Sequence, residues 1–325
     1  MVAAVRVHKH GGPEVLTYEQ IEVGEPGPGQ IKLKQYACGV NYIDTYFRMG
    51  MYPSPVGLPF VAGNEGAGEV IAVGPGVTDI KVGDRVGYVA PLGGYAAERL
   101  LPADRAVKLP DKLSYEQAAA IMLKGMTAQY LLRRTFKVEK GHTILVHAAA
   151  GGVGLLLCQW ANALGATVIG TVGSEEKAAL AKANGAHHTI LYRKENFVEK
   201  VKEITGGKLC DVVYDGIGKD TFPASLDCIR PIGMFVSYGS ASGPIEAFNI
   251  NLLQTKGSLF ATRPTLNTYA AKRADLLAIA QDTFDVVLSG KVKIPINQKY
   301  PLKDAAKAHR ELEGRQTTGA SILLP

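Results

Sequence analysis

The stretch TILVHAAAGGVGLLLCQWANALGATVIGT, residues 143–171, constrains the fold more than any other part of the chain. An apolar strand from Thr143 to His147 leads into a glycine-rich turn, which is followed by a helix, Gly165 and a second apolar strand over 166–171. Strand, turn, helix and strand in this order are typical of a βαβ unit that binds a dinucleotide. A tight turn without a ligand is the less favoured interpretation, because it does not explain this context.

The glycines of the turn each have a physical role in binding a pyrophosphate. Gly151 and Gly152 leave room for the backbone to approach the anion, and Val153 follows them. Gly154 lets the helix pack against the sheet with its N-terminal N–H groups aimed at the phosphates. Ala149 replaces the first glycine of the usual fingerprint, which affects the turn geometry more than the expected function.

The end of the second strand predicts which dinucleotide is bound. An enzyme that uses NAD usually carries Asp or Glu there to hold the ribose 2′-hydroxyl. This chain reads IGTVGSEEK instead, with Gly173 and Ser174 at that place and Lys177 one turn into the next helix. Because a hydroxyl and an ammonium favour a 2′-phosphate, whereas a carboxylate repels it, we expect NADPH as the cofactor.

An alternative for Lys177 is that it is only a solvated helix residue, since Glu175 and Glu176 stand beside it. After the next strand, Tyr192 in ILYRKENF is a candidate to pack on the adenine-ribose end of the cofactor. Arg193 is a further candidate at the same place.

Three later apolar runs, LCDVVYDGIG (209–218), PIGMFVSYGSASG (231–243) and GSLFATRP (257–264), read as further strands of the same sheet. In an open parallel sheet the carboxyl ends of the strands form the ligand crevice. The residues expected to face the cofactor from these ends are Gly216, Tyr238, Gly239, Ser240 and Arg263.

The first 110 residues have a different sequence pattern, in which short β-rich runs are separated by turns such as EPGPGQ and KVGD. This pattern predicts an irregular β domain. At SYEQ, Ser114 and Gln117 form a capping box that starts a helix. The elements after Arg263 do not continue the nucleotide-binding pattern and are expected to complete the first domain. The predicted division is therefore 1–124 with 264–325, and 125–263 for the nucleotide-binding domain.

Bulk composition limits the class of protein. The chain is 46% hydrophobic and 20% charged, which is typical of a globular protein. No apolar run is long enough for a membrane span, and the charged N-terminus MVAAVRVHKH does not resemble a signal peptide, so we expect a cytoplasmic protein without a membrane partner. The four cysteines are too dispersed for a metal knuckle. A net charge of +6 without a basic run does not indicate nucleic-acid binding.

The whole chain resembles the zinc-free NADPH:quinone oxidoreductases, the zeta-crystallin-like group of the medium-chain dehydrogenase/reductase superfamily. The resemblance rests on GGPEVL, NYIDTYFRMGMYP, GNEGAGEVIAVGPGV, KVGDRV, HAAAGGVG, GTVGSEEK, DVVYDGIG and TTGASILLP, which occur in this order. It implies an α/β fold with a Rossmann nucleotide-binding domain and a GroES-like irregular β catalytic domain. It also implies a homodimer joined near GSLFATR.

Within that superfamily, zinc alcohol dehydrogenases bind a metal through residues that this chain lacks. The matching positions hold Asn41, Asn64 and, by approximate alignment, Leu123. Two amides and an aliphatic side chain cannot hold zinc, so no metal is expected. Ile43 stands where those enzymes have a hydroxyl for proton relay. Quinones and enones are electron-poor and need only hydrogen-bond donors, which makes quinone reduction the expected activity.

The expected roles around this position follow from the same comparison. Asn41 orients the nicotinamide-ribose region or donates to the acceptor oxygen, unless it only forms a turn, and Tyr42 and Ile43 lie on the cofactor beside it. Tyr46 and Tyr52 shape the pocket, or are core residues.

Three further roles are expected next to these. Asp44 is expected to orient Arg48 or Lys124. Lys124 places positive charge near the acceptor or is an ordinary surface lysine, and Thr127 and Tyr130 line the cofactor channel.

Two rival functions remain open from the sequence. The nearer is reduction of an alkenal or enone double bond on the same fold. The more distant is a non-catalytic NADPH-binding or RNA-binding role, for which the sequence offers no RNA module or basic stripe. Comparing quinone and alkenal acceptors separates the first, and filter binding at rising salt tests the second.

Overall fold

The computed structural model describes all 325 residues, which form two compact units. Unit 1 comprises Met1–Met126, Lys272–Phe284 and Ile294–Pro325, and unit 2 comprises Thr127–Ala271 and Asp285–Lys293. These boundaries depart from the predicted ranges in three places, the first being that residues 125 and 126 group with unit 1. Residues 264–271 and 285–293 group with unit 2, because Tyr269 stacks on Tyr130 and the backbone of Lys293 hydrogen-bonds to Gln159.

Unit 1 is built on strands that are antiparallel apart from one parallel pair, Ile296–Pro301 with Ala320–Leu324. One sheet has the order β2 (Leu16–Ile21), β1 (Val2–Val7) and β4 (Phe60–Val61). The larger sheet has the order β15 (Ile296–Pro301), β16 (Ala320–Leu324), β3 (Gln30–Val40), β5 (Glu65–Val73), β6 (Arg85–Val89) and β8 (Ala106–Lys108), with β7 (Glu98–Pro102) also paired to β3. The last strand of the chain thus pairs with β3, where Ser321 lies opposite Val40.

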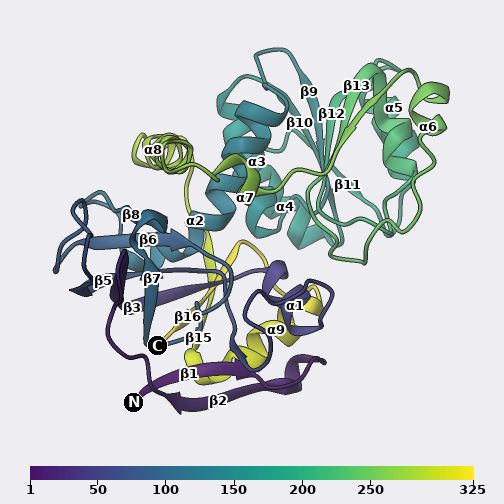
Figure 1. Cartoon of the computed structure of the whole chain (residues 1–325). Coiled ribbons are helices and arrows are strands. Elements are labelled where there is room, and N and C mark those ends of the chain that lie inside the picture. The colour runs from purple at the N-terminus through teal and green to yellow at the C-terminus, as the bar shows by residue number, and fades with distance from the viewer. The chain divides into compact units, whose positions relative to one another are not determined.

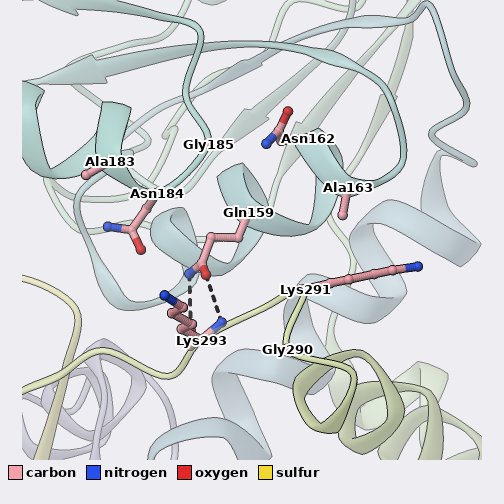
Figure 2. A pocket seen from close by; sticks show the side chains of 9 residues that line it. All are labelled: Gln159, Asn162, Ala163, Ala183, Asn184, Gly185, Gly290, Lys291 and Lys293. Carbon is pink, nitrogen blue, oxygen red and sulfur yellow. Dashed lines mark hydrogen bonds between the residues drawn. The ribbon is translucent and has the colours of Figure 1, made fainter.

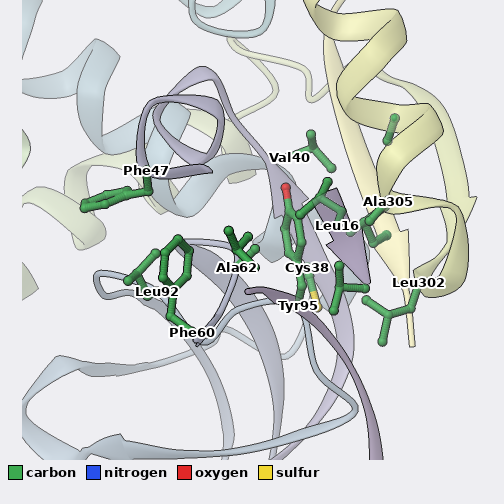
Figure 3. Close-up of a cluster of buried hydrophobic side chains, with 14 of the residues drawn as sticks. Leu16, Cys38, Val40, Phe47, Phe60, Ala62, Leu92, Tyr95, Leu302 and Ala305 are labelled. Atoms are coloured by element: carbon green, nitrogen blue, oxygen red, sulfur yellow. The ribbon is translucent and has the colours of Figure 1, made fainter. Parts of the chain in front are cut away.

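The helices of unit 1 are α1 (Tyr42–Arg48) and α9 (Ala305–Glu313), and α2 (Tyr115–Tyr130) and α8 (Arg273–Leu288) each begin in this unit. The core beneath α1 and α9 gathers side chains from distant segments, including Val5, Cys38, Phe47, Tyr95 and Leu323. Figure 3 shows Tyr95 among these side chains. A phenol in such a core needs a polar partner for its hydroxyl group, and this requirement shapes the site described below.

Unit 2 is a six-stranded parallel sheet whose strands lie in the order β11 (His188–Leu191), β10 (Thr167–Val172), β9 (Thr143–Val146), β12 (Cys210–Asp215), β13 (Ile229–Ser237) and β14 (Phe260–Thr262). This is the doubly wound order of dinucleotide-binding domains, with the switch point between β9 and β12. Its helices are α3 (Gly152–Ala163), α4 (Glu175–Ala183), α5 (Phe197–Thr205), α6 (Asn251–Thr255) and α7 (Leu266–Tyr269), as Figure 1 labels them.

The predicted βαβ unit is confirmed as β9, α3 and β10. Its strands are apolar because both faces of a parallel sheet are covered, and Ile144, Leu145 and Val146 have no exposed surface. The predicted α/β fold with a separate β domain is likewise confirmed. None of the helices combines the length and apolar character needed to cross a bilayer.

Candidate functional site

The glycine-rich turn of unit 2 leaves the start of α3 open to an anion. Gly151 is the N-cap residue, and no side chain caps the first N–H groups of the helix, which begins with Gly152 and Val153. A Cβ added to Gly154 would clash with the carbonyl oxygen of Ala148, so the close approach of helix and turn requires glycine there. The donors of the first turn are therefore available to a pyrophosphate.

The end of β10 gathers hydroxyl and cationic groups around Gly173. A Cβ built on Gly173 would lie 3.1 Å from the Tyr192 hydroxyl oxygen and 3.6 Å from Nε of Arg193. Ser174 caps α4 by accepting from the Lys177 backbone N–H at 3.4 Å. The strand end itself carries no carboxylate.

The two glutamates beside Ser174 differ in their contacts. Glu175 pairs with Lys194 at 3.5 Å. A hydrogen bond with Ser174 lowers the pKa of Glu176, so one carboxylate does contact the group of residues around Gly173.

The carboxyl ends of β12, β13 and β14 bring together the residues predicted there. A Cβ on Gly216 would lie 2.9 Å from the Tyr238 ring, and one on Gly239 would lie 2.6 Å from the Gly216 carbonyl oxygen. Arg263 donates to the Ser237 carbonyl at 2.8 Å and to the Ser240 hydroxyl at 3.2 Å. Glycine at 216 and 239 thus lets two neighbouring strand ends approach each other.

Thr127 and Tyr130 are both buried at the end of α2. The Tyr130 ring stacks on Tyr269 with centroids 4.7 Å apart, and burial raises the pKa of its phenol. Sequence reasoning did not identify Tyr269, because the stacking depends on α7 returning to α2.

Sequence reasoning also did not identify a second group of polar residues, which includes His147 at the start of the glycine-rich turn. His147 contacts the Thr171 hydroxyl at 2.9 Å through Nδ1 and the Ser225 hydroxyl at 3.0 Å through Nε2. Asp215 in turn accepts from Ser225 at 3.3 Å and from the Ile217 backbone N–H at 2.7 Å. These bonds join β9, β10 and β12 at the ends that carry the predicted site.

In unit 1, Asn41 and Lys124 converge on one buried carboxylate. The Asn41 amide donates to Oε2 of Glu65 at 2.9 Å, and Nζ of Lys124 lies 3.4 Å from the same oxygen. The backbone N–H of Leu123 donates to the other oxygen at 2.6 Å. Glu65 has no exposed surface, and a Cβ on Gly39 would clash with its carboxylate. Lys124 is 5% exposed, so it is not a surface lysine.

Asp44 has partners other than the predicted ones. It accepts from the Asn41 backbone N–H at 2.8 Å, from the Asn64 amide at 2.6 Å and from the Tyr95 hydroxyl at 2.8 Å. Asp44 makes no hydrogen bond to Arg48 or Lys124, the residues that it was expected to orient, because Arg48 binds Glu313 and Lys124 binds Glu65. Lys124 acts on Asp44 through its charge, which lowers the pKa of that carboxyl group.

The environment of Asp44 has opposing effects on its acidity. Burial raises the pKa of Asp44 to about 6, and the hydrogen bonds from Asn64, Asn41 and Tyr95 oppose that rise.

The donor set at this position does not fit a zinc ion. The amides of Asn41 and Asn64 already donate to Glu65 and Asp44, and the Asn64 oxygen accepts from the Leu92 backbone N–H at 3.2 Å. No group of three or more His, Cys, Asp or Glu residues is arranged to hold a metal. Hydrogen bonds between protein groups fill the place that metal ligands take in a zinc site.

The remaining predicted residues of unit 1 lie on or next to α1. Tyr46 is 5% exposed and packs edge-on against Tyr52 with ring centroids 5.3 Å apart, whereas Tyr52 is half-buried. Ile43 packs against the core of this unit, and the Tyr42 hydroxyl donates to the Leu312 carbonyl at 2.9 Å.

A separate cavity of about 240 Å³ lies at the other end of α3, away from the glycine-rich turn. It is lined by Gln159, Asn162, Ala163, Ala183, Asn184, Gly185, Gly290, Lys291 and Lys293. Figure 2 shows the Gln159 side chain bonded to the backbone of Lys293, so its amide is already satisfied. None of the predicted site residues lines this cavity.

The chain matches known proteins along its whole length. Residues 27–111 match the family described as alcohol dehydrogenase GroES-like domain, and residues 152–274 match the family described as zinc-binding dehydrogenase. A quinone oxidoreductase of Pseudomonas aeruginosa is 52% identical over 100% of both chains. A 2-haloacrylate reductase of a Burkholderia species is 50% identical over 100% of this chain and 99% of its own. The structure of Escherichia coli quinone oxidoreductase complexed with NADPH superposes with a TM-score of 0.97 at 48% identity, covering 99% of this chain and 100% of that one.

Proposed function

The chain belongs to the quinone oxidoreductase family of the medium-chain dehydrogenase/reductase superfamily, and on that premise we propose that it reduces quinones with NADPH and without zinc. The observation that carries the proposal is the convergence of Asn41 and Lys124 on Glu65. It places the Asn41 amide at a position where a metal-dependent relative has a ligand, and the Lys124 ammonium group next to another such position, Leu123. Such groups suffice for an acceptor that already delocalises negative charge.

Unit 2 supports the choice of cofactor. The uncapped first turn of α3 would receive the pyrophosphate, and Ser174, Lys177 and Arg193 would surround the 2′-phosphate. NADPH, when bound, supplies the electrons for the acceptor. The lack of a carboxylate at the end of β10 disfavours NADH in the same position. The Escherichia coli relative with NADPH bound supports this assignment.

In unit 1 the proposed roles fall to residues on and around α1. Asn41 would orient the nicotinamide-ribose region or donate to the acceptor oxygen, with Lys124 adding positive charge. Tyr46, Tyr52 and Ile43 would offer the aromatic and apolar walls against which a planar quinone packs, and Tyr46 contacts Tyr52 edge-on.

The homodimer expected from the sequence is also part of this proposal. β14 is the edge strand of its sheet, and Phe260 on it is 56% exposed, which suits pairing of two copies. Sedimentation should give twice the mass of the 34.6 kDa chain, and a monomer at micromolar concentration rejects the dimer. The cytoplasmic location stays a prediction, as do the catalytic and NADPH-binding roles of the two domains, whose predicted ranges differ from units 1 and 2 as described above.

A second candidate acceptor is an activated carbon–carbon double bond. The observation that favours it is the 50% identity to a 2-haloacrylate reductase, whose name denotes such a substrate. The pocket chemistry needed is similar, because an enone also delocalises the charge it gains.

The deciding experiment is steady-state oxidation of NADPH and NADH with 1,4-benzoquinone, 1,2-naphthoquinone and a simple alkenal as acceptors. Turnover with NADPH and a quinone, weak with NADH, is the expected result. Faster turnover with the alkenal supports the second candidate, and NADPH binding without turnover on any acceptor rejects both.

Variants of the site test the residue roles in the same assay. Asn41→Ala and Tyr52→Phe should each lower kcat/KM for the quinone by about tenfold. Tyr36→Phe, which alters an exposed tyrosine of the same unit, is the matched control. Unchanged kcat/KM in both site variants would reject these roles.

A further inference from the structure

A continuous chain of buried hydrogen bonds leads from Asp44 to the C-terminal helix. The Tyr95 hydroxyl lies 2.8 Å from Oδ2 of Asp44 and 2.9 Å from Nε2 of His309. Nδ1 of His309 lies 3.0 Å from Nη1 of Arg48, which forms a two-pronged ion pair with Glu313 at 2.9 and 2.7 Å. The chain crosses from α1 through the loop before β7 to α9.

The direction of every bond in this chain follows from one residue. Arg48 can only donate, so Nδ1 of His309 must be the acceptor. A neutral imidazole that accepts at Nδ1 carries its proton on Nε2, which therefore donates to the Tyr95 oxygen. The Tyr95 hydroxyl hydrogen is then left for Asp44. One tautomer of His309 thus satisfies all three contacts, and a protonated imidazole does not.

Asp44 connects these hydrogen bonds to Asn41 in the proposed acceptor site. Its carboxylate holds the backbone N–H of Asn41 at 2.8 Å, while the side chain of Asn41 holds Glu65 at 2.9 Å. Asn41 is therefore fixed from two sides, by Asp44 through its backbone and by Glu65 through its amide. A shift of the Asp44 carboxylate would rotate Asn41 away from that arrangement.

We propose that Tyr95 and His309 are positioning residues for the proposed reaction, which fix the Asp44 carboxylate and through it Asn41. This inference rests on the proposed function. It assigns to α9 a part in the chemistry of the site, although α9 carries none of the residues that would touch the acceptor or the cofactor. Figure 1 shows α9 beside α1, and the two helices contact each other.

The burial of these hydrogen-bonded residues supports a role for them other than stabilising the fold. Arg48 and His309 have no exposed surface, and Asp44 is 1% exposed. Buried charged groups are often no more stabilising than apolar side chains of the same shape, so stability alone does not explain them. Burial and the neighbouring Arg48 also lower the pKa of His309 to about 3, in agreement with a neutral ring. The charged or titratable groups next to this ring are Arg48 and Tyr95.

The kinetic test compares variants of the residues in this series of hydrogen bonds with a matched control. Tyr95→Phe and His309→Leu should each lower kcat with a quinone by about tenfold and leave the KM for NADPH unchanged. His309→Gln should recover most of that loss, because an amide can accept from Arg48 and donate to Tyr95. Tyr88→Phe is the control, since it removes the hydroxyl of another fully buried tyrosine of unit 1, one that bonds to Gln35.

A double substitution shows whether the effect runs through Asp44. If it does, Tyr95→Phe combined with Asp44→Asn should be no slower than Asp44→Asn alone. If the two substitutions lower kcat independently, so that their effects multiply, the inference is overturned. It is also overturned if the unaltered protein turns over quinone and Tyr95→Phe is as fast as Tyr88→Phe. Both outcomes leave the proposed function standing. Absence of turnover in the unaltered protein overturns the proposed function first, and this inference with it.

A spectroscopic readout does not depend on turnover. In protein with ¹⁵N-labelled histidine, His309, identified by loss of its signals in His309→Gln, should show a neutral ring protonated on Nε2. This pattern should persist unchanged from about pH 5 to 8, whereas an ordinary histidine titrates there. A charged ring, or one protonated on Nδ1, overturns the inference.

Discussion

At the scale of single residues, the environment of Asp44 predicts how activity depends on pH. Burial raises its pKa from 3.8 to about 6, so the carboxylate takes up a proton as the pH falls through that value. The protonated group can no longer accept from Asn41, Asn64 and Tyr95 together. We expect kcat/KM for a quinone to be level above about pH 7 and to fall below about pH 6.

The control for this prediction is Asp44→Asn, which cannot titrate. Its lower activity should show no acid limb near pH 6, while Tyr88→Phe should keep the limb of the unaltered protein. An identical limb in Asp44→Asn would assign the titration to another group.

Also at the residue scale, the groups around Gly173 predict cofactor preference. Lys177→Ala and Arg193→Ala should each raise the KM for NADPH about tenfold, since each removes a charge next to the expected 2′-phosphate. The KM for NADH should not change. Lys200→Ala, which removes an exposed lysine paired with Glu203, serves as the control. Equal effects on both cofactors would contradict this assignment.

At the scale of elements, the start of α3 depends on the contact between helix and turn. Gly154→Ala should lower affinity for NADPH more than tenfold and reduce thermal stability, because the added methyl group would press on the Ala148 carbonyl. Gly27→Ala is the control, since its added Cβ would make only an ordinary contact, 3.4 Å from Gln30. NADPH affinity in Gly154→Ala equal to that of the unaltered protein would show that the turn does not hold the pyrophosphate.

Also at the element scale, the main strands of unit 2 were predicted from sequence, because each apolar run and the turn that follows it are local. Their order, with β12 beside β9, was observed only in the structure. The assignment of 264–271 and 285–293 to unit 2 was likewise not predicted. It depends on Tyr269 stacking on Tyr130 and on Gln159 bonding to Lys293, pairs that are far apart in the chain.

At the scale of the whole molecule, we expect activity to survive metal removal. Dialysis against a strong chelator should leave kcat unchanged, and elemental analysis of the active protein should find far less than one zinc per chain. Adding zinc should not raise the activity. A stoichiometric zinc ion whose removal abolishes turnover would contradict the assignment of Asn41 and Asn64 as hydrogen-bonding rather than metal-binding residues.

The sequence by itself determined what depends on neighbours in the chain. The βαβ unit, the missing carboxylate at the end of β10 and the missing zinc ligands are all read from residue types within short segments. Glycine at 154 follows from the same local geometry.

Only the tertiary structure decided the partners of the buried polar groups. Glu65 joins Asn41 to Lys124, and Tyr95 meets His309 across 214 positions of sequence. The sequence suggested Arg48 for Asp44, but folding placed Tyr95 and His309 between the two. The physical reason is that a buried donor or acceptor must be satisfied by whichever group packing brings beside it, and packing is not encoded in local spacing.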